Sequence, residues 1–305
     1  KKLVELHSEK ADASFGVGDL YLGKVKKLIP GLNAAFIDVG FEKDAFLHYT
    51  DLSPYVRSIL KFTHQAINDK SEKGFDFSEF KVEPEIIKTG KADQVLTKRQ
   101  HILVQILKEP ISTKGHRLSC EITIPGRYLV LTPFTDIVAV SKKIASSEER
   151  KRLQLLVESI KPKNFGVIVR TAAEGKKVAD LHNDIRELED KWKTMFQQLK
   201  QTKTPDKILS EIDKTSSILR DILNDNFNKI TVDDKDMYQS IKDYMGSIAP
   251  DKVKILQQYK GSRHIFDHYD INRQIKASFG KTSTMSSGAY IVIEHTEAMH
   301  VIDVN

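Results

Sequence analysis

The chain has little of what builds disulfide scaffolds, and it lacks a long apolar run. Cys120 is the one cysteine among 305 residues, and no run of 18 apolar residues occurs. A lone cysteine excludes an internal disulfide framework and a cysteine-rich zinc site within the chain, and one reduced thiol fits the cytosol. Without a long apolar run we expect no transmembrane helix. We therefore predict a cytoplasmic protein.

What the chain does contain is enough apolar residues for a core and a modest excess of positive charge. Apolar residues make up 40% of the sequence, charged residues make up 30%, and the net charge is +6, with a pI of about 9.0. A length of 305 residues predicts about two domains or several small subdomains. The basic balance favours an anionic partner, with nucleic acid as the first candidate, although many proteins that bind no polyanion carry a similar excess.

An acidic residue interrupts the last apolar segment of the chain. Residues 288–305 read GAYIVIEHTEAMHVIDVN, in which residues 290–294 and 299–304 have the composition and length of strands. Asp303 breaks the second run, and Asn305 follows it. Because burying a bare carboxylate is costly, Asp303 must be solvated, paired or bound to a metal. One interpretation is a turn or surface residue, and the other is a ligand for a hard cation such as magnesium.

Short strands separated by glycine-containing turns occupy residues 18–52. This segment reads GDLYLGKVKKLIPGLNAAFIDVGFEKDAFLHYTDL. Closely spaced short strands predict a small barrel or sandwich. Strand alternation places Phe36 and Asp38 on the same face, and a face that carries an acid is expected to meet solvent rather than the core. For Phe46 both a core and a surface position stay open.

An arginine and a threonine stand at the end of another predicted strand. Arg170 and Thr171 lie in residues 166–176, which read GVIVRTAAEGK. The arginine side chain offers a planar fork matched to phosphate oxygens, and threonine adds a hydroxyl donor. Taken alone this pair says little about function, because surface arginines are common.

Helical patterns dominate the second half of the chain. Ser146 and Glu149 fit a capping box at the start of a helix. An apolar stripe in residues 178–203 predicts a long helix whose stripe serves packing. Residues 208–279 alternate helices and short strands, including a strand at 253–256, which predicts an α/β layer.

Taken in order, the segment at residues 18–52 and the strings VIVRTAAEG and IVIEHTEAMHVIDVN resemble the bacterial ribonuclease E/G family. The resemblance implies an α+β chain of several subdomains. An OB-fold barrel of the S-one type would be inserted in an RNase-H-like α/β subdomain, followed by a five-prime sensor region and the start of a DNase-I-like catalytic domain. The implied boundaries are 1–15 for N-terminal strands of the RNase-H-like subdomain (with residues 3–7 as a strand), 16–117 for the barrel, 118–207 for the sensor region, 208–279 for the rest of the RNase-H-like subdomain and 280–305 for the start of the catalytic domain.

The resemblance also assigns RNA contacts to the barrel. In the family, two aromatic residues on the barrel face and a lysine before a glycine contact RNA, and they correspond here to Phe36, Phe46 and Lys114. Stacking a base on an aromatic ring contributes about 1–3 kcal/mol with little sequence preference. Residues 53–99 depart from the common form of the module, and we interpret them as a loop insertion that begins with a helix. A solvated loop is favoured over an additional RNA contact, because loops tolerate insertions well.

The resemblance assigns the chemistry to residues nearer the C-terminus. Arg170 and Thr171 would bind a five-prime terminal monophosphate. Asp303 would be a magnesium ligand and catalytic residue, and Asn305 would help to orient the metal site. The second metal-binding aspartate of the family lies further along the chain than Asn305.

These assignments predict a magnesium-dependent endoribonuclease that cleaves single-stranded RNA, prefers five-prime monophosphate ends and acts in RNA processing and decay. The alternative is a non-catalytic RNA-binding module or scaffold. The chain opens at Lys1 without an initiator methionine and stops within a motif, so we expect a fragment truncated at both ends, with little or no activity of its own. For the full-length protein we expect a homo-oligomer, with any zinc held by residues outside this chain.

Overall fold

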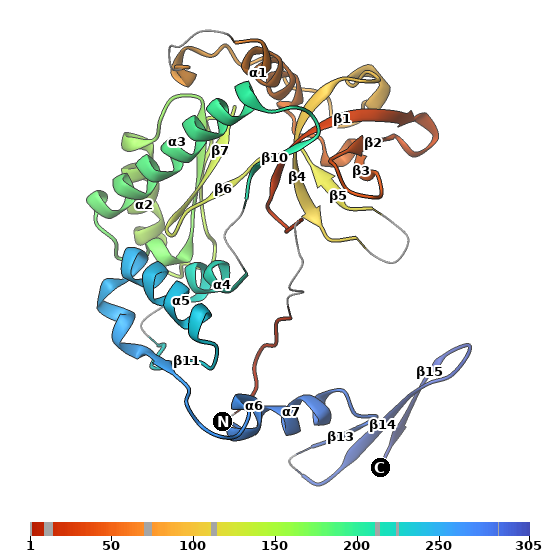
Figure 1. The fold of residues 1–305 in the computed structure, drawn as a ribbon, viewed down its shortest axis with the longest axis vertical. Coiled ribbons are helices and arrows are strands. Elements are labelled where there is room, and N and C mark those ends of the chain that lie inside the picture. Colours follow the sequence, from red (N-terminus) through yellow and green to blue (C-terminus); the bar gives the residue numbers. More distant parts are fainter. Residues whose placement is uncertain are drawn as a thin grey trace. The chain divides into compact units, whose positions relative to one another are not determined.

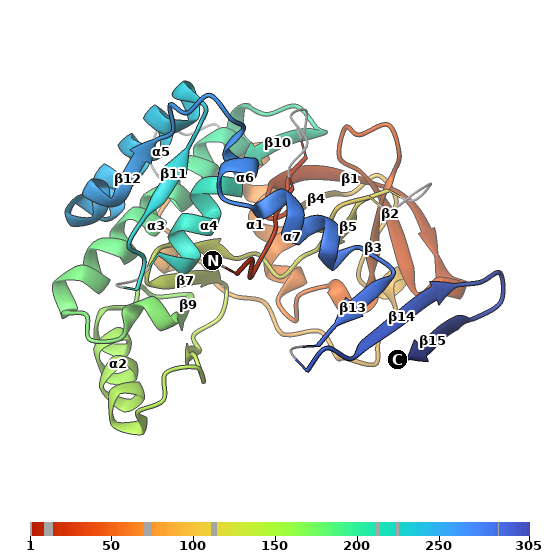
Figure 2. The same ribbon diagram turned by 90° about the horizontal axis from the view of Figure 1, so that it is seen from below.

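The computed structural model describes residues 2–8, 15–69, 75–110, 115–210, 214–223, 226–285 and 287–305. Its contacts divide the chain into a larger unit, Asp12–Asn224, and a smaller unit in which Lys1–Ala11 joins Asp225–Asn305. Figure 1 and Figure 2 draw both units as ribbons. Within the described residues, no helix has both the length and the apolar character that crossing a membrane requires.

The first part of the larger unit is a barrel (Figure 1). Within the described residues, its five strands are β1 (Leu20–Ile29), β2 (Ala34–Asp38), β3 (Ala45–His48), β4 (His101–Lys108) and β5 (Arg117–Ser119). They pair in the order β1-β2-β3-β5-β4, and β4 pairs back onto β1 to close the barrel. β3 and β5 are parallel, whereas the other pairs are antiparallel. This closed barrel is consistent with the OB-like fold that the resemblance implies.

Alternation along β2 and β3 decides which side chains fill the barrel. Ala35, Ile37 and Leu47 point inward and are fully buried. Phe36 and Asp38 point outward and are half-buried, which confirms that they share the solvent face. Gly23 of β1 lies close to the Ile37 side chain of β2. A Cβ atom at position 23 would stand 2.6 Å from the Ile37 Cγ2 atom. Only glycine therefore allows β1 and β2 to approach this closely.

The insertion at residues 53–99 is not the solvated loop that we predicted. It contains α1 (Val56–Asn68) and the short 3-10 helices η3 (Phe77–Glu79) and η4 (Ala92–Gln94). Val56, Ile59 and Phe62 of α1 are buried, with at most 1% of their surfaces exposed. The apolar face of α1 packs against β4 and against α3 (Val178–Gln201). Burial of the apolar face of α1 stabilises the insertion as part of the fold. The prediction of a solvated loop did not take this burial into account.

A second sheet follows the barrel within the larger unit. Its strand order is β6 (Ile124–Pro125), β7 (Leu129–Pro133), β9 (Phe165–Val169) and β8 (Val138–Val140). The helices α2 (Ser147–Ile160) and α3 pack against it, and β10 (Asp206–Leu209) returns the chain to pair with β1. The unit ends with α4 (Lys214–Ile222). Ser146 caps α2 by accepting a hydrogen bond from the Glu149 N–H at 3.2 Å, which is one half of the predicted capping box. The Glu149 carboxylate accepts hydrogen bonds from Arg152 and from the Gly175 N–H instead of one from the Ser146 N–H.

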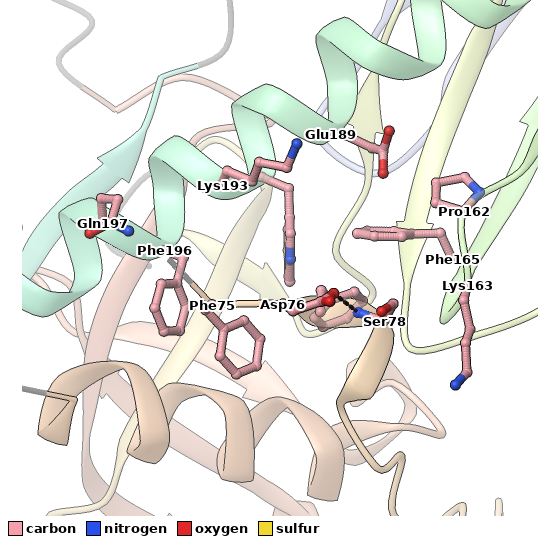
Figure 3. A pocket seen from close by; sticks show the side chains of 12 residues that line it. Phe75, Asp76, Ser78, Pro162, Lys163, Phe165, Glu189, Lys193, Phe196 and Gln197 are labelled. Carbon is pink, nitrogen blue, oxygen red and sulfur yellow. Dashed lines mark hydrogen bonds between the residues drawn. The ribbon is translucent and has the colours of Figure 1, made fainter. Parts of the chain in front are cut away.

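An aromatic cluster joins the insertion to this second layer. Phe62 stacks on Trp192 of α3 with ring centroids 4.9 Å apart, and Phe75 stacks on Phe196 at 4.4 Å. The predicted stripe of α3 is therefore packing, except that Val178 at its start is 44% exposed. A pocket of about 490 Å³ with aromatic walls lies beside this cluster. Figure 3 shows its lining side chains, of which the polar ones include Lys163, Asp76, Ser78, Glu189, Lys193 and Gln197.

The smaller unit has a core of its own between short elements. β11 (Ile230–Val232) pairs in parallel with β12 (Leu256–Gln258), and α5 (Lys235–Ile248) packs against both strands. Two predictions for this unit are wrong. Residues 3–7 form no strand, and Leu3 instead donates its N–H to the Gln274 side chain at 2.6 Å. The strand predicted at 253–256 begins only at Leu256, because the 3-10 helix η6 (Pro250–Ile255) precedes it.

The remainder of the smaller unit consists of two short helices and an antiparallel β-sheet. α6 (Ile265–His268) and α7 (Ile271–Ser278) precede β13 (Thr282–Thr284), β14 (Tyr290–His295) and β15 (His300–Val304). The three strands are antiparallel in chain order, and β14 with β15 forms the long hairpin drawn in dark blue in Figure 2. The side chains of β15 are exposed, so Asp303 stands at the surface of this hairpin.

Candidate nucleic-acid interface

Phe36 and Phe46 lie side by side on the outer face of the barrel. They are direct partners across β2 and β3, and their ring centroids are 5.9 Å apart at an interplanar angle of 64°. The register continues on both sides, because Lys27 of β1 pairs with Phe36 and Arg117 of β5 pairs with Phe46. Lys27, Phe36, Phe46 and Arg117 therefore form one line across the barrel, which we call the aromatic row. Two half-buried rings flanked by basic residues suit a ligand that has planar groups and negative charge.

Two basic residues at or beside the aromatic row, Arg117 and Lys26, are paired with acidic side chains. Arg117 forms a bidentate ion pair with Asp51, in which Nε donates to one carboxylate oxygen at 2.8 Å and Nη2 donates to the other at 3.0 Å. Lys26 binds Asp44 at 2.6 Å and lies 3.7 Å from Asp38, and its hydrogen bond with Asp44 raises the pKa of Lys26. These pairs fix the direction of both cations without burying them. An incoming phosphate would compete with a carboxylate at each of them.

Lys114, the third residue assigned to this face, lies outside the described residues. Cys120, close to it in sequence, is fully buried, and burial raises the pKa of its thiol well above the usual range. A buried, protonated thiol is a poor nucleophile. Cys120 is therefore not placed to act as a nucleophile.

Arg170 lies against the turn that connects β6 and β7. Its backbone N–H donates to the carbonyl of Tyr128 at 2.8 Å, and its Nη1 atom donates to the carbonyl of Gly126 at 2.9 Å. A third contact joins its Nη2 atom to the Asp221 carboxylate of α4 at 2.6 Å. The side chain is 20% exposed. Arg170 is thus held from two sides, with part of its surface open to solvent.

Thr171 follows as the first residue of the 3-10 helix η5 (Thr171–Ala173) and is exposed. Two cations lie over the ring of Tyr128, in the turn between β6 and β7: the Arg127 guanidinium is 5.1 Å from the centre of the ring, and the Lys176 ammonium is 5.6 Å from it. Sequence reasoning did not single out these residues, although PGRYLV carried a signal in the basic residue directly after the turn glycine. The arrangement offers several positive groups to an anion beside Arg170.

The buried carboxylate of Asp184, on α3, binds the backbone of the turn between β6 and β7. It is 7% exposed, and its carboxylate accepts hydrogen bonds from the N–H groups of Arg127 at 3.1 Å, Tyr128 at 2.9 Å and Leu129 at 2.8 Å. Burial raises the pKa of Asp184, and these backbone donors oppose the shift. The sequence did not indicate this residue, which lies 57 positions from Arg127.

Asp303 and Asn305 are joined directly at the end of the β14–β15 hairpin. The Asn305 side chain donates a hydrogen bond from Nδ2 to the Asp303 Oδ2 atom at 2.9 Å. Asp303 pairs with Val292 across the hairpin, and both polar residues are exposed. The amide therefore orients a carboxylate that remains open to solvent.

This pair fits part of a magnesium site. Magnesium prefers oxygen ligands, keeps several waters and is usually held through one or two carboxylates, so Asp303 can serve as one ligand with Asn305 orienting it. Among the residues that the structure describes, no group of three or more His, Cys, Asp or Glu side chains is placed to hold a metal ion. Glu294 on the neighbouring strand is paired with Lys281 at 3.0 Å.

Comparison with known proteins identifies the relatives of this chain. A sequence model described as the Ribonuclease E/G family matches residues 123–305. The chain belongs to the ribonuclease E/G family. Ribonuclease G of Haemophilus influenzae is 36% identical over 303 residues, which is 99% of this chain, and ribonuclease G of Escherichia coli (strain K12) is 32% identical over 303 residues. Ribonuclease E of Nostoc sp. is 35% identical over 294 residues.

Membership of the ribonuclease E/G family confirms the resemblance drawn from the sequence motifs. The chain spans 58% of the length of the two ribonuclease G relatives and 39% of the ribonuclease E relative. The match to the ribonuclease E/G model contains Arg170, Thr171, Asp303 and Asn305, and the likeness to the ribonuclease G relatives extends over nearly the whole chain. The roles of the individual residues remain predictions.

Proposed function

We propose that the protein is an endoribonuclease that cleaves single-stranded RNA with magnesium and favours five-prime monophosphate ends. The observation that carries this proposal is the Asp303 carboxylate, exposed and oriented by Asn305 at 2.9 Å, in a chain whose relatives are named ribonuclease G and ribonuclease E. An exposed carboxylate held by a neighbouring amide suits a ligand for a hard cation. RNA processing and decay is the process in which we place this activity.

The aromatic row would bind the RNA strand. The half-buried rings of Phe36 and Phe46 are close enough for two bases to contact them, and stacking works equally for all bases. Lys27 and Arg117 at its two ends would meet the phosphates that flank those bases. Because the faces of bases in a duplex are covered by their neighbours, this surface favours single-stranded RNA.

The group around Arg170 would recognise the five-prime end. A guanidinium binds phosphate through paired hydrogen bonds, and the Thr171 hydroxyl, exposed beside it, adds a donor. The contact of Arg170 with Asp221 would exchange for a contact with the phosphate, since both acceptors are anions. A terminal monophosphate offers more charge than a five-prime hydroxyl, and this difference is the basis of the proposed preference.

Asp303 would hold the metal, and Asn305 would fix the direction of its carboxylate. When bound, a magnesium ion supplies activation of a water molecule and neutralises charge that develops on the phosphate. The side chains of the protein would bind and orient the reactants. Asp303 would present its carboxylate oxygens at the surface of the hairpin, and the barrel and the Arg170 group would bind the RNA strand.

The test uses the purified full-length protein and short RNAs with one labelled end. We expect magnesium-dependent cleavage of single-stranded RNA, loss of cleavage in EDTA, and little cleavage of a duplex of the same sequence. A non-catalytic RNA-binding module is the second candidate, favoured by the lack of a three-residue metal group among the described residues. Tight binding of single-stranded RNA without magnesium-dependent cleavage would support that candidate and contradict the proposed activity.

A further inference from the structure

The turn beside Arg170 is shaped around a buried carboxylate. The consecutive N–H groups of Arg127, Tyr128 and Leu129 all point to Asp184, at 3.1, 2.9 and 2.8 Å. The turn is also closed on itself, because the Gly126 N–H donates to the carbonyl of Leu129 at 2.8 Å. Consecutive backbone N–H groups that converge on one point form a nest that binds anions. Here a side chain of the protein itself occupies the nest.

The close approach of the carboxylate depends on Gly126. A Cβ atom at this position would lie 2.7 Å from both Asp184 carboxylate oxygens, closer than non-bonded atoms can stand. A side chain at position 126 would therefore push the turn and Asp184 apart. Because burying a carboxylate without hydrogen bonds is costly, the nest and Asp184 depend on each other for their positions.

The opposite side of the same turn holds Arg170. The carbonyl of Gly126 accepts a hydrogen bond from Nη1 of Arg170 at 2.9 Å, and the carbonyl of Tyr128 accepts one from its backbone N–H at 2.8 Å. Three N–H groups of the turn thus face Asp184, while the carbonyls of Gly126 and Tyr128 face Arg170. A rotation of these peptide groups would change both sets of contacts together.

We propose that Asp184 is a positioning residue for recognition of the RNA five-prime phosphate, an inference that rests on the function proposed above. By filling the nest, Asp184 turns the carbonyl of Gly126 toward Arg170 and fixes the direction of the guanidinium. It also occupies the backbone donors that could otherwise bind the phosphate themselves. Recognition is then left to side chains, with Arg170 as the central contact, and Asp184 acts without touching the RNA.

The test compares RNAs that differ only in a five-prime monophosphate or a five-prime hydroxyl. In the full-length protein, Asp184→Asn keeps the size of the side chain but replaces an acceptor oxygen with a donor group. We expect the ratio of cleavage rates on the two RNAs to fall about tenfold, as for the loss of one good hydrogen bond to a charged group, while cleavage of the hydroxyl RNA changes little. The matched control is Asp190→Asn on the same helix, whose side chain is 72% exposed and pairs with Lys193; its ratio should equal that of the wild type.

A second variant separates positioning from general stability. Gly126→Ala keeps the carboxylate but moves the turn, and we expect the same fall in the ratio. The Tm of each variant is measured together with its cleavage rates. If Asp184→Asn does not fold, the ratio of cleavage rates for Gly126→Ala tests the inference. A lowered Tm with an unchanged ratio would mean that Asp184 only ties α3 to the sheet, and it would overturn the inference. A wild type that does not distinguish the two RNAs would instead overturn the proposed five-prime preference, and the inference with it.

Discussion

The rings of Phe36 and Phe46 face the same side of the barrel, 5.9 Å apart and inclined at 64°. Their backbone pairing places Lys27 and Arg117 at the two ends of the same line. The inward neighbours Ile37 and Leu47 are fully buried, so the core of the barrel does not depend on the two rings. This separation makes RNA binding and stability independently measurable.

Phe36→Ala should weaken binding of single-stranded RNA by about 1–3 kcal/mol, because one stacking surface is lost. We expect the Tm to change little, since the ring is only half-buried. A fluorescence binding titration and a thermal melt measure the two quantities. Leu155→Ala, which removes an apolar side chain that is 72% exposed on α2, is the control for loss of surface area. A sharp fall in Tm with unchanged affinity would place Phe36 in the core and refute its assigned role.

Arg170 and Asp221 should act in opposite directions on five-prime recognition. Arg170→Ala removes the paired phosphate contact and should bring the ratio of cleavage rates on monophosphate and hydroxyl RNA close to one. Asp221→Asn removes the carboxylate that lies 2.6 Å from the Arg170 Nη2 atom and 2.9 Å from the Arg220 Nε atom. It should raise the ratio by roughly two- to fivefold, because the phosphate no longer competes with a carboxylate for Arg170. Asp136→Asn, which removes an 83% exposed carboxylate that pairs with Lys161, is the control. An unchanged ratio in Arg170→Ala would exclude Arg170 from recognition.

Phe62→Ala should destabilise the larger unit without affecting RNA binding. Phe62 is fully buried and stacks on Trp192 of α3 at 4.9 Å, so its removal leaves a cavity between the insertion and the second sheet. Substitutions of this kind cost roughly 3–5 kcal/mol. Urea unfolding measures the loss. A change below about 1 kcal/mol, as at most surface positions, would mean that the insertion contributes little to the fold.

The parts of the fold that follow from local pattern were predictable. Alternation in β2 and β3 indicated which side Phe36 would face, and the helical stripe indicated which face of α3 would pack. The insertion was misjudged because the tolerance of loops for insertions favoured a solvated loop, whereas Phe62 and Phe77 bury against residues more than a hundred positions away. The strand at residues 3–7 was implied by the family resemblance, and it failed because likeness of sequence does not show whether a neighbouring strand is available for pairing.

The candidate site was predictable only where a motif marked it. The resemblance pointed to Arg170 and Asp303, and the structure describes both with close polar partners. Asp184 was invisible in the sequence, because its importance comes from three backbone donors brought to it by the pairing of β7 and β9 with α3 packed nearby. A single acid in an amphipathic helix gives no sign of such a contact.

Glu149 should link stability to acid pH. Its hydrogen bond with Arg152 and the N–H of Gly175 lower its pKa from 4.5 to about 2. A carboxylate with a lowered pKa stabilises the folded state above its unfolded pKa, and this contribution is lost as the pH falls through the folded value. Glu149→Gln should therefore be less stable than the wild type at pH 6, and the difference should shrink between pH 4.5 and 2. Thermal melts across this range test the prediction, and a constant difference would contradict it.

Asp303 is the residue on which the proposed activity depends most directly. The measurement is magnesium-dependent cleavage of single-stranded RNA by the full-length protein, alongside RNA affinity, for the wild type, Asp303→Asn and the control Glu297→Gln in the turn of the same hairpin. Asp303→Asn keeps the shape but loses the charge that would hold magnesium, so we predict that cleavage falls by several orders of magnitude while affinity stays near the wild-type value. Glu297→Gln should cleave normally. Cleavage by Asp303→Asn at close to the wild-type rate would contradict the account.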